Sequence, residues 1–206
     1  MYALVTVWFG VRFTKAQQSD TLIMCYLGVF MSIISIGYSR RKIQEFTQAL
    51  NDNGVKYLID VRTKPFSKYH PDFNKETLQA ILQEAGIKYV FMGDTVGGLP
   101  SDPQCYTDGK VDYRKTAASE VFLRGLERLI KANSLDVNVS IMCSEMKPEQ
   151  CHRTKLIGKE LLKKGITISH LDEQNVIRTQ SEIIDRITKG QYSMFEDEFT
   201  SVKKYR

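Results

Sequence analysis

The sequence predicts an α/β fold in three layers, with helices on both faces of a mostly parallel sheet of about five strands. From residue 33 onward, short apolar runs alternate with longer segments whose apolar residues recur at helical spacing. The short runs are apolar almost throughout, as is typical of strands that are buried on both faces of a parallel sheet. Strands and helices that alternate in this way are joined by right-handed crossovers, which place the helices over the sheet.

Five segments have the length and composition of buried strands: residues 33–37, 55–61, 87–92, 137–142 and 166–170. We expect Ser39 and Asn74 to cap the helices after the first two strands, since both residue types favour that position. Pro148 suits the first position of the helix after the fourth strand, which we expect to end at Gly165. A last helix is expected over residues 174–188, and a polar loop over residues 93–115.

The length of 206 residues suits one domain with an addition at each end. Residues 1–30 show no clear period and precede Met31, which would make a natural start, so we interpret them as an N-terminal extension. Residues 31–189 form the predicted domain. Residues 190–206 are expected to be a solvated or loosely docked tail.

Composition sets broad limits on function. The chain is 42% hydrophobic and 26% charged, and its net charge of +5 is compatible with a phosphate-bearing partner. No secretory signal is evident, so we expect a cytoplasmic protein. Residues 21–39 carry no charge and are long enough to span a bilayer. Because the sheet needs residues 33–37 as a strand, we expect no membrane partner.

The chain has four cysteines, too few for a disulfide scaffold at this length. In a reducing cytosol, clustered cysteines more often bind metals or take part in catalysis. Cys25 and Cys105 are isolated in the sequence, and we interpret them as structural. Cys143 and Cys151 belong to a segment rich in polar residues and are better candidates for chemistry.

Ligands of open parallel sheets bind outside the carboxyl ends of the strands, so the residues that follow each strand are candidates for a site. They are Tyr38 and Ser39 after the first strand, Asp60, Arg62 and His70 after the second, Gly97 and Gly98 after the third, Cys143, Glu145, Cys151, His152 and Arg153 after the fourth, and His170 and Asp172 after the fifth. All three histidines of the chain fall on this predicted edge.

The residues after the fourth strand carry the richest chemistry. We expect Cys143 at the strand tip and Cys151 in the first turn of the next helix, where the helix dipole lowers a thiol pKa. Arg153 would lower that pKa further, and free backbone N–H groups at the same helix end could bind a phosphate. Glu145 and His152 are candidate proton carriers. The predicted catalytic residues are therefore Cys143, Glu145, Cys151 and His152.

The other candidates are predicted to bind a substrate or its phosphate: Tyr38, Ser39, Asp60, Arg62, His70, Gly97, Gly98 and Arg153. Most of them have a plainer alternative. Arg62 clamps an anion that Asp60 orients, or the two form a buried ion pair. The glycine pair allows close approach of a ligand, or forms a turn. His70 binds a ligand or is an exposed loop residue, and His170 is more typical of a structural histidine.

Four blocks of the sequence are also found together in a known family. They are IGYS at residues 36–39, DVRTKPFSKYHPDFN at residues 60–74, Gly97-Gly98, and CSEMKPEQCHR at residues 143–153. From about residue 33 to residue 187 the chain resembles the family called domain of unknown function 488. The resemblance implies a Rossmann-like domain in a soluble bacterial or archaeal protein. It also implies a site and no particular reaction, the site being formed by Cys143, Glu145, Cys151, His152 and Arg153 with Asp60 and Arg62.

The first functional hypothesis is an enzyme that acts on a nucleotide, a nucleic acid or another phosphate-bearing molecule, with a cysteine as nucleophile. The ten positions between Cys143 and Arg153 do not match the short phosphate loop of thiol phosphatases. The sequence alone leaves open whether the chain is an enzyme.

Three other functions stay open. Cys143, Cys151 and His152 could bind zinc or iron, although eight positions between the cysteines exceed the usual spacing of structural zinc ligands. No other cofactor is predicted. The two cysteines could instead form a reversible disulfide. A nucleic-acid-binding protein without catalysis is the fourth hypothesis, although no known nucleic-acid-binding signature is present.

Overall fold

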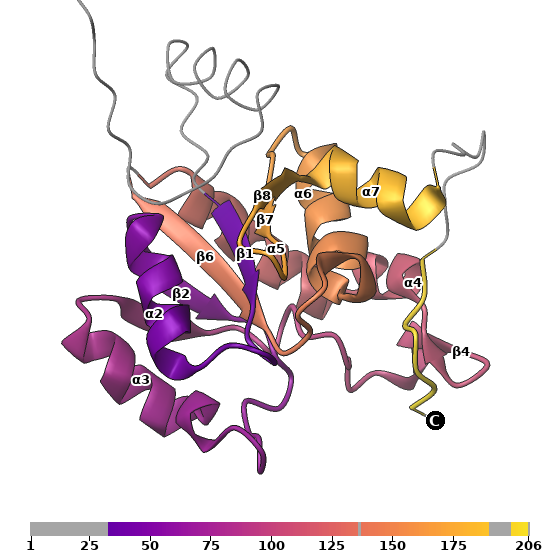
Figure 1. Ribbon diagram of the computed structural model, residues 1–206. Helices are drawn as coiled ribbons and strands as arrows, with labels where there is room; N and C mark the ends of the chain where they lie inside the picture. The colour runs from indigo at the N-terminus through magenta and orange to yellow at the C-terminus, as the bar shows by residue number, and fades with distance from the viewer. Residues whose placement is uncertain (1–32, 136, 190–198, 206) are drawn as a thin grey trace, which may run out of the picture.

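The computed structural model describes residues 33–135, 137–189 and 199–205, which form a central sheet with helices on both faces (Figure 1). The sheet has six strands in the order β3-β2-β6-β1-β7-β8. Their bounds are β1 (Ile33–Gly37), β2 (Val55–Asp60), β3 (Lys88–Phe91), β6 (Asn138–Cys143), β7 (Ser169–Leu171) and β8 (Ile177–Thr179). The first five pair in parallel, and β8 pairs antiparallel with β7. The α/β class and the mostly parallel sheet are confirmed.

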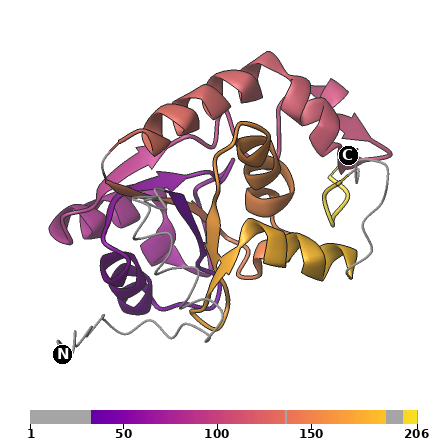
Figure 2. The ribbon, with the colours of Figure 1, turned by 90° about the horizontal axis from the view of Figure 1, so that it is seen from above.

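The two faces of the sheet bury two separate apolar cores. The view from above shows helices on both sides of the sheet (Figure 2). On one face, α2 (Ile43–Asp52) and α3 (Lys75–Glu84) bury their apolar stripes against the sheet, among them Phe46 and Leu82. On the other face, α5 (Glu120–Asn133) and α6 (Lys159–Lys163) do the same, among them Leu129 and Leu161. Burial on both faces explains the mainly apolar sequence of the central strand β1, which is buried at every residue, whereas the edge strand β3 exposes Lys88.

The strand order brings three chain segments to one point. β6 lies between β1 and β2, so that Gly37 pairs with Cys143 and Asp60 pairs with Met142. The carboxyl ends of these three strands are therefore neighbours, although they are distant in the sequence. This is the edge at which an open parallel sheet binds ligands.

Two helix starts differ in their caps. Asn74 occupies the N-cap of α3 as predicted, but Lys42 and not Ser39 occupies the N-cap of α2. The prediction for Ser39 is wrong because its backbone N–H donates to the Ser144 carbonyl, 3.1 Å away, and the chain turns before the helix begins. Ser39 thereby connects the ends of β1 and β6.

The predicted helix from Pro148 to Gly165 is interrupted. Pro148 begins a single 3-10 turn, η3 (Pro148–Gln150), and Cys151 is extended, with φ −110° and ψ 149°. A π-helical segment, η4 (Arg153–Gly158), then leads into α6. Cys151 therefore precedes the helical segment and does not lie in its first turn, and its carbonyl accepts hydrogen bonds from Thr154 and Lys155. Short π-helical segments occur often at functional sites.

The C-terminal part of the domain and the long loop hold more structure than predicted. The expected helix over residues 174–188 begins only at α7 (Gln180–Thr188), because residues 177–179 form β8 and Thr179 caps the helix. The fifth predicted strand is displaced toward Ser169–Leu171. The polar loop contains η2 (Pro103–Cys105), a hairpin of β4 (Tyr106–Thr107) and β5 (Lys110–Val111), and α4 (Tyr113–Ala118).

The chain ends are covered only in part. Residues 1–32, with Cys25, Met31 and most of the uncharged stretch, lie outside the described residues, as do residues 190–198 of the predicted tail. Residues 199–205 are docked on the domain, where Ser201 donates its N–H to the Val111 carbonyl and Thr200 bridges to Asp112. Within the described ranges, no helix has the length and apolar character to cross a membrane.

Candidate functional site

Four side chains gather at the end of β6: Cys143, Glu145, Cys151 and His152. One sulfur, oxygen or nitrogen atom from each lies within 4.8 Å of all the others. The two cysteines and His152 are buried, whereas Glu145 is partly exposed. The cluster is thus a largely buried set of donor atoms with a carboxylate on its open side.

The carboxylate lies against both sulfurs. Glu145 Oε2 is 2.8 Å from Cys143 Sγ and 3.3 Å from Cys151 Sγ, and it accepts hydrogen bonds from both thiols. The sulfurs of Cys143 and Cys151 lie 3.7 Å and 3.6 Å from His152 Nδ1. Cys143 and Cys151 are not bonded to each other in this structure.

Two glycines allow this approach. An ideal Cβ on Gly37 would lie 2.1 Å from the Glu145 carbonyl oxygen, so any larger residue would displace the loop after β6. A Cβ on Gly98 would lie 2.9 Å from His152 Nδ1. The close neighbour of Gly98 is therefore a residue of the cluster, whereas a Cβ on Gly97 would lie 2.1 Å from the Gly93 carbonyl oxygen.

The orientation of His152 follows from its second ring nitrogen. His152 Nε2 lies 3.2 Å from the Val61 carbonyl oxygen, which can only accept a hydrogen bond. Nε2 therefore carries a proton, and in the neutral ring Nδ1 presents a lone pair to the two sulfurs. Metal-binding histidines are commonly oriented by such a hydrogen bond to a carbonyl.

Arg153 lies beneath the cluster and is fully buried. Its Nε is 3.2 Å from Cys151 Sγ, its Nη1 donates to Ser35 Oγ at 3.1 Å, and its Nη2 donates to the Glu145 carbonyl at 2.7 Å. In this arrangement the guanidinium contacts the thiol and the backbone and is not presented to solvent. The sequence led us to expect that Arg153 binds a phosphate. The structure instead places its guanidinium behind the thiols.

The thiols are electrostatically unequal. Burial alone would raise the pKa of Cys151, but the hydrogen bond from Cys143 and the charges of Arg153 and His152 outweigh it and lower that pKa well below its ordinary value. Burial, together with the neighbouring Cys151, raises the pKa of Cys143. Burial would lower the pKa of His152, but the charge of Cys151 raises it. Of the two thiols, Cys151 is therefore the one that more readily loses its proton.

A buried polar chain supports Arg153 from the far side. Ser35 Oγ lies 2.6 Å from His170 Nδ1, His170 Nε2 lies 2.6 Å from Gln180 Oε1, and Gln180 Nε2 donates to the Thr154 carbonyl at 3.0 Å. Gln180 Oε1 can only accept a hydrogen bond, so His170 is protonated on Nε2. His170 Nδ1 therefore accepts a hydrogen bond from the Ser35 hydroxyl. The sequence suggested a structural role for His170 and gave no signal for Ser35 or Gln180, which meet it only in the folded chain.

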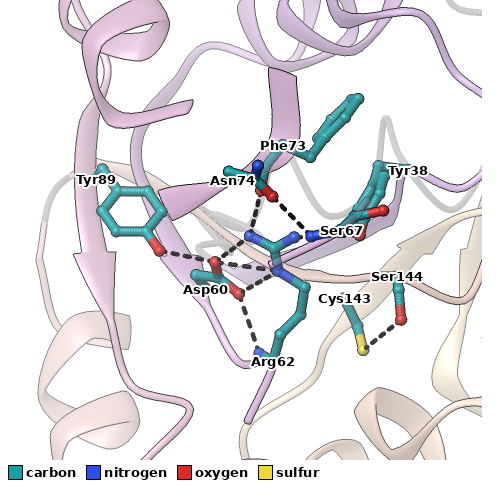
Figure 3. Close-up of polar contacts among 9 residues, drawn as sticks. All are labelled: Tyr38, Asp60, Arg62, Ser67, Phe73, Asn74, Tyr89, Cys143 and Ser144. Carbon is teal, nitrogen blue, oxygen red and sulfur yellow. Dashed lines mark hydrogen bonds and ion pairs between the residues drawn. The ribbon is translucent and has the colours of Figure 1, made fainter. Parts of the chain in front are cut away.

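Asp60 and Arg62 form a second cluster beside Cys143 (Figure 3). Arg62 Nε lies 2.9 Å from Asp60 Oδ1 and Nη2 lies 2.6 Å from Oδ2. The same guanidinium donates to the Tyr38 hydroxyl at 3.1 Å and to the Phe73 carbonyl at 2.8 Å. The Tyr89 hydroxyl donates to Asp60 at 2.7 Å. Both charges are buried, which favours the alternative of a buried ion pair over a clamp for an anion.

The remaining candidates lie around this ion pair. The Tyr38 ring stacks on Phe73 with ring centroids 4.2 Å apart, and the partly buried His70 ring contacts the edge of Tyr38. Ser39 is held by its backbone contact to Ser144. Asp172, which follows the fifth strand, forms an ion pair with Arg178 and not with the Asp60–Arg62 pair.

A family model described as "Domain of unknown function DUF488" matches residues 42–159, a range that includes the whole cysteine cluster and the Asp60–Arg62 pair. No curated protein matches the chain. A crystal structure described as "Putative phosphatase (DUF442)" from Shewanella putrefaciens CN-32 matches with 17% sequence identity, 80% of each chain covered and a TM-score of 0.40.

Proposed function

The chain belongs to the family described as domain of unknown function DUF488, and we propose that its central site binds one divalent cation of the zinc class. One observation carries the proposal: two sulfurs, an imidazole nitrogen and a carboxylate oxygen lie within 4.8 Å of one another at the sheet edge where ligands bind. Cysteine, histidine and glutamate are the residues that bind zinc in proteins.

The spacing of the donor atoms supports a tetrahedral ion. Zinc bonds of about 2.3 Å to sulfur and about 2.0–2.1 Å to nitrogen place these two atoms about 3.6 Å apart in a tetrahedron. The two sulfur-to-nitrogen distances to His152 are 3.7 Å and 3.6 Å. Glu145 lies closer to the sulfurs because it accepts hydrogen bonds from the two thiols. A bound cation would displace these thiol protons into solvent.

Charge balance also favours a divalent cation. Two thiolates and one carboxylate bring three negative charges to a mostly buried site, and Arg153 supplies one positive charge against them. A divalent cation supplies the other two. Buried charges are stable in proteins only when they are paired in this way.

We further propose that the bound ion is catalytic. Three donors are buried, namely Cys143, Cys151 and His152, while the fourth, Glu145, is partly exposed and can leave its position to water. Three protein ligands with an exchangeable fourth position characterise catalytic zinc sites. Zinc deaminases activate water with two cysteines and a histidine and use a glutamate as proton carrier. Metal-assisted hydrolysis, with Glu145 moving the proton, is the reaction class that fits this arrangement.

Metal analysis of the full chain, purified without a histidine tag, tests the proposal. We expect about one equivalent of metal per chain, and its loss in Cys143→Ser, Cys151→Ser and His152→Ala. Cys105→Ser is the matched control, since Cys105 is a buried thiol outside the cluster. Reconstitution with Co²⁺ should give thiolate-to-metal charge-transfer absorption. Less than a tenth of an equivalent, with no such absorption after reconstitution, refutes the proposal.

A second candidate function uses the thiols without metal. The contact between Arg153 Nε and Cys151 Sγ at 3.2 Å favours a thiolate nucleophile at Cys151, assisted by Glu145 or His152. This alternative predicts rapid alkylation of Cys151 in protein as purified. A bound metal predicts protection of both cysteines until a chelator is added.

A further inference from the structure

The loop between β2 and α3 exposes two aromatic rings. Phe66 is 73% exposed and Tyr69 is 88% exposed, more than any other large hydrophobic residue among those that the structure describes. Full exposure of two aromatic side chains three residues apart loses the stabilisation that their burial would provide. Such rings are typical of surfaces that bind a partner.

The backbone that carries these rings is well held. Ser67 donates its N–H to Asn74 Oδ1 at 2.6 Å, the Ser67 hydroxyl accepts from the His70 N–H at 3.1 Å, and the Pro65 carbonyl accepts from the Lys75 N–H at 3.0 Å. The rings are therefore presented by a fixed loop, and little ordering of the backbone would accompany binding.

Positive charge accompanies the rings. Between residues 64 and 75 the sequence contains Lys64, Lys68 and Lys75 against the single acidic residue Asp72, a net charge of +2. Lys64 and Lys68 are exposed and alternate with the two rings in the order Lys-Pro-Phe-Ser-Lys-Tyr. Aromatic rings alternating with lysines match a ligand of flat bases joined by phosphates.

The loop begins at the candidate metal centre. The Val61 carbonyl binds His152, and Thr63 Oγ1 accepts the Leu99 N–H at 3.0 Å. Phe66 follows Val61 by five residues, so it lies within about 18 Å of that carbonyl. A chain of a few nucleotides could contact the rings and the centre at the same time.

We propose that the Lys64–Tyr69 loop binds single-stranded nucleic acid, with Phe66 and Tyr69 stacking on bases and Lys64 and Lys68 contacting phosphates. Paired bases within a duplex do not offer their faces to protruding rings, so a single strand is the better partner. Single-stranded nucleic acid would be the substrate class of the proposed function. Its turnover would rest on the proposed metal site, whereas its binding to the loop needs no metal.

Fluorescence anisotropy of the full chain with labelled oligonucleotides of about 15 residues tests the inference, using oligo(dT), oligo(rU) and a duplex. Phe66→Ala with Tyr69→Ala should weaken single-strand binding about ten-fold or more, since each stacked base contributes strongly. Lys64→Gln with Lys68→Gln should reduce the slope of log affinity against log salt by about 1.4, because each contact to a single strand contributes about 0.7. Leu162→Ala with Lys164→Gln, an exposed pair on and next to α6, is the matched control and should bind like the unmodified chain.

Several outcomes overturn the inference. They are absence of single-strand binding at low salt, equal binding of the duplex, and equal weakening by the control pair. Stronger binding of oligo(rU) than of oligo(dT), or the reverse, supports the inference and identifies the nucleic acid. Phe66→Ala with Tyr69→Ala should lose oligonucleotide binding and keep its metal, because neither ring belongs to the cysteine cluster, so failure of the metal proposal and failure of this inference give different results.

Discussion

Arg153 Nε lies 3.2 Å from Cys151 Sγ, and the guanidinium is completely buried beneath the thiol. A buried positive charge at this distance stabilises a thiolate, whether the sulfur is free or bound to a metal. Arg153 also links β1 to the loop after β6, since it reaches Ser35 on β1 and the Glu145 carbonyl in that loop. Its position therefore couples the electrostatics of the site to the packing of the sheet.

We predict that Arg153→Lys raises the pKa of Cys151 in metal-free protein. Lysine retains the charge but cannot make the three directed contacts that the guanidinium makes, so the thiolate is less stabilised. Alkylation of Cys151 measured against pH by mass spectrometry should shift toward higher pH. Cys105, whose pKa is raised by burial, is the internal control and should keep its profile. An unchanged Cys151 profile would show that Arg153 has only a packing role.

His170 makes a prediction about stability and pH. Burial lowers the pKa of His170 to about 4, whereas an exposed histidine titrates near 6.5. Between these values the unfolded chain binds the extra proton, so stability falls as the pH drops from about 6.5 to about 4, by up to about 3 kcal/mol. Above pH 6.5 this residue adds no pH dependence.

Urea unfolding of the wild type and His170→Gln from pH 7.5 to pH 4.5 measures this effect. The variant should be less stable at pH 7.5, because Ser35 and Gln180 lose a partner, but its stability should decline less at lower pH. Carboxylates such as Asp172, whose pKa is lowered by hydrogen bonds that outweigh its burial, affect both proteins equally. Parallel stability curves for the two proteins would contradict the prediction.

The sequence predicts the parts of this molecule that depend on local pattern. The apolar runs locate the five parallel strands because most residues of β1, β6 and β7 are buried, although the edge strand β3 is only half-buried. Asn74 was correctly placed at the N-cap of α3, although its side chain accepts from the Ser67 N–H and makes no capping hydrogen bond. β8 was missed because it has three residues and pairs only through β7. The cysteine cluster was predictable, since its members follow one strand.

The inward orientation of the Arg153 side chain was not predictable from the sequence. Arg153 follows a cysteine and a histidine, and residue type alone suggests a phosphate ligand. It turns inward because Ser35, 118 positions earlier, offers an acceptor inside the sheet. Ser35 also contacts His170, which lies 135 positions later in the sequence, because β1 pairs with β7. Contacts of this kind depend on strand order, which a single sequence does not contain.

Gly98 provides a test of the metal centre from outside the ligand set. The methyl group of Gly98→Ala would lie 2.9 Å from His152 Nδ1, which is too close without movement of the ring. We predict that this variant folds but binds metal about ten-fold or more weakly, as variants that disturb the support of a ligand commonly do. Competition with a chromophoric chelator measures the affinity. Gly86→Ala is the control for a glycine loss that costs stability alone: its φ of +71° strains an alanine, but the added methyl group meets no neighbouring atom. Metal affinity equal in all three proteins would contradict the prediction.

Removal of one charge of the Asp60–Arg62 pair should destabilise the protein strongly, whereas removal of both charges together should cost less than the sum of the two losses. Asp60→Asn leaves the Arg62 guanidinium buried without its counter-charge, and we predict a loss of about 3–5 kcal/mol in the free energy of unfolding. Asp60→Ala combined with Arg62→Met removes both charges and should lose less than the two single variants together. Tyr89→Phe, which removes one hydrogen bond to Asp60, should lose only about 1 kcal/mol. Urea denaturation measures five variants, namely Asp60→Asn, Asp60→Ala, Arg62→Met, the double variant and Tyr89→Phe. Additive losses in the double variant would mean that the two charges act independently and that Arg62 remains available to a ligand.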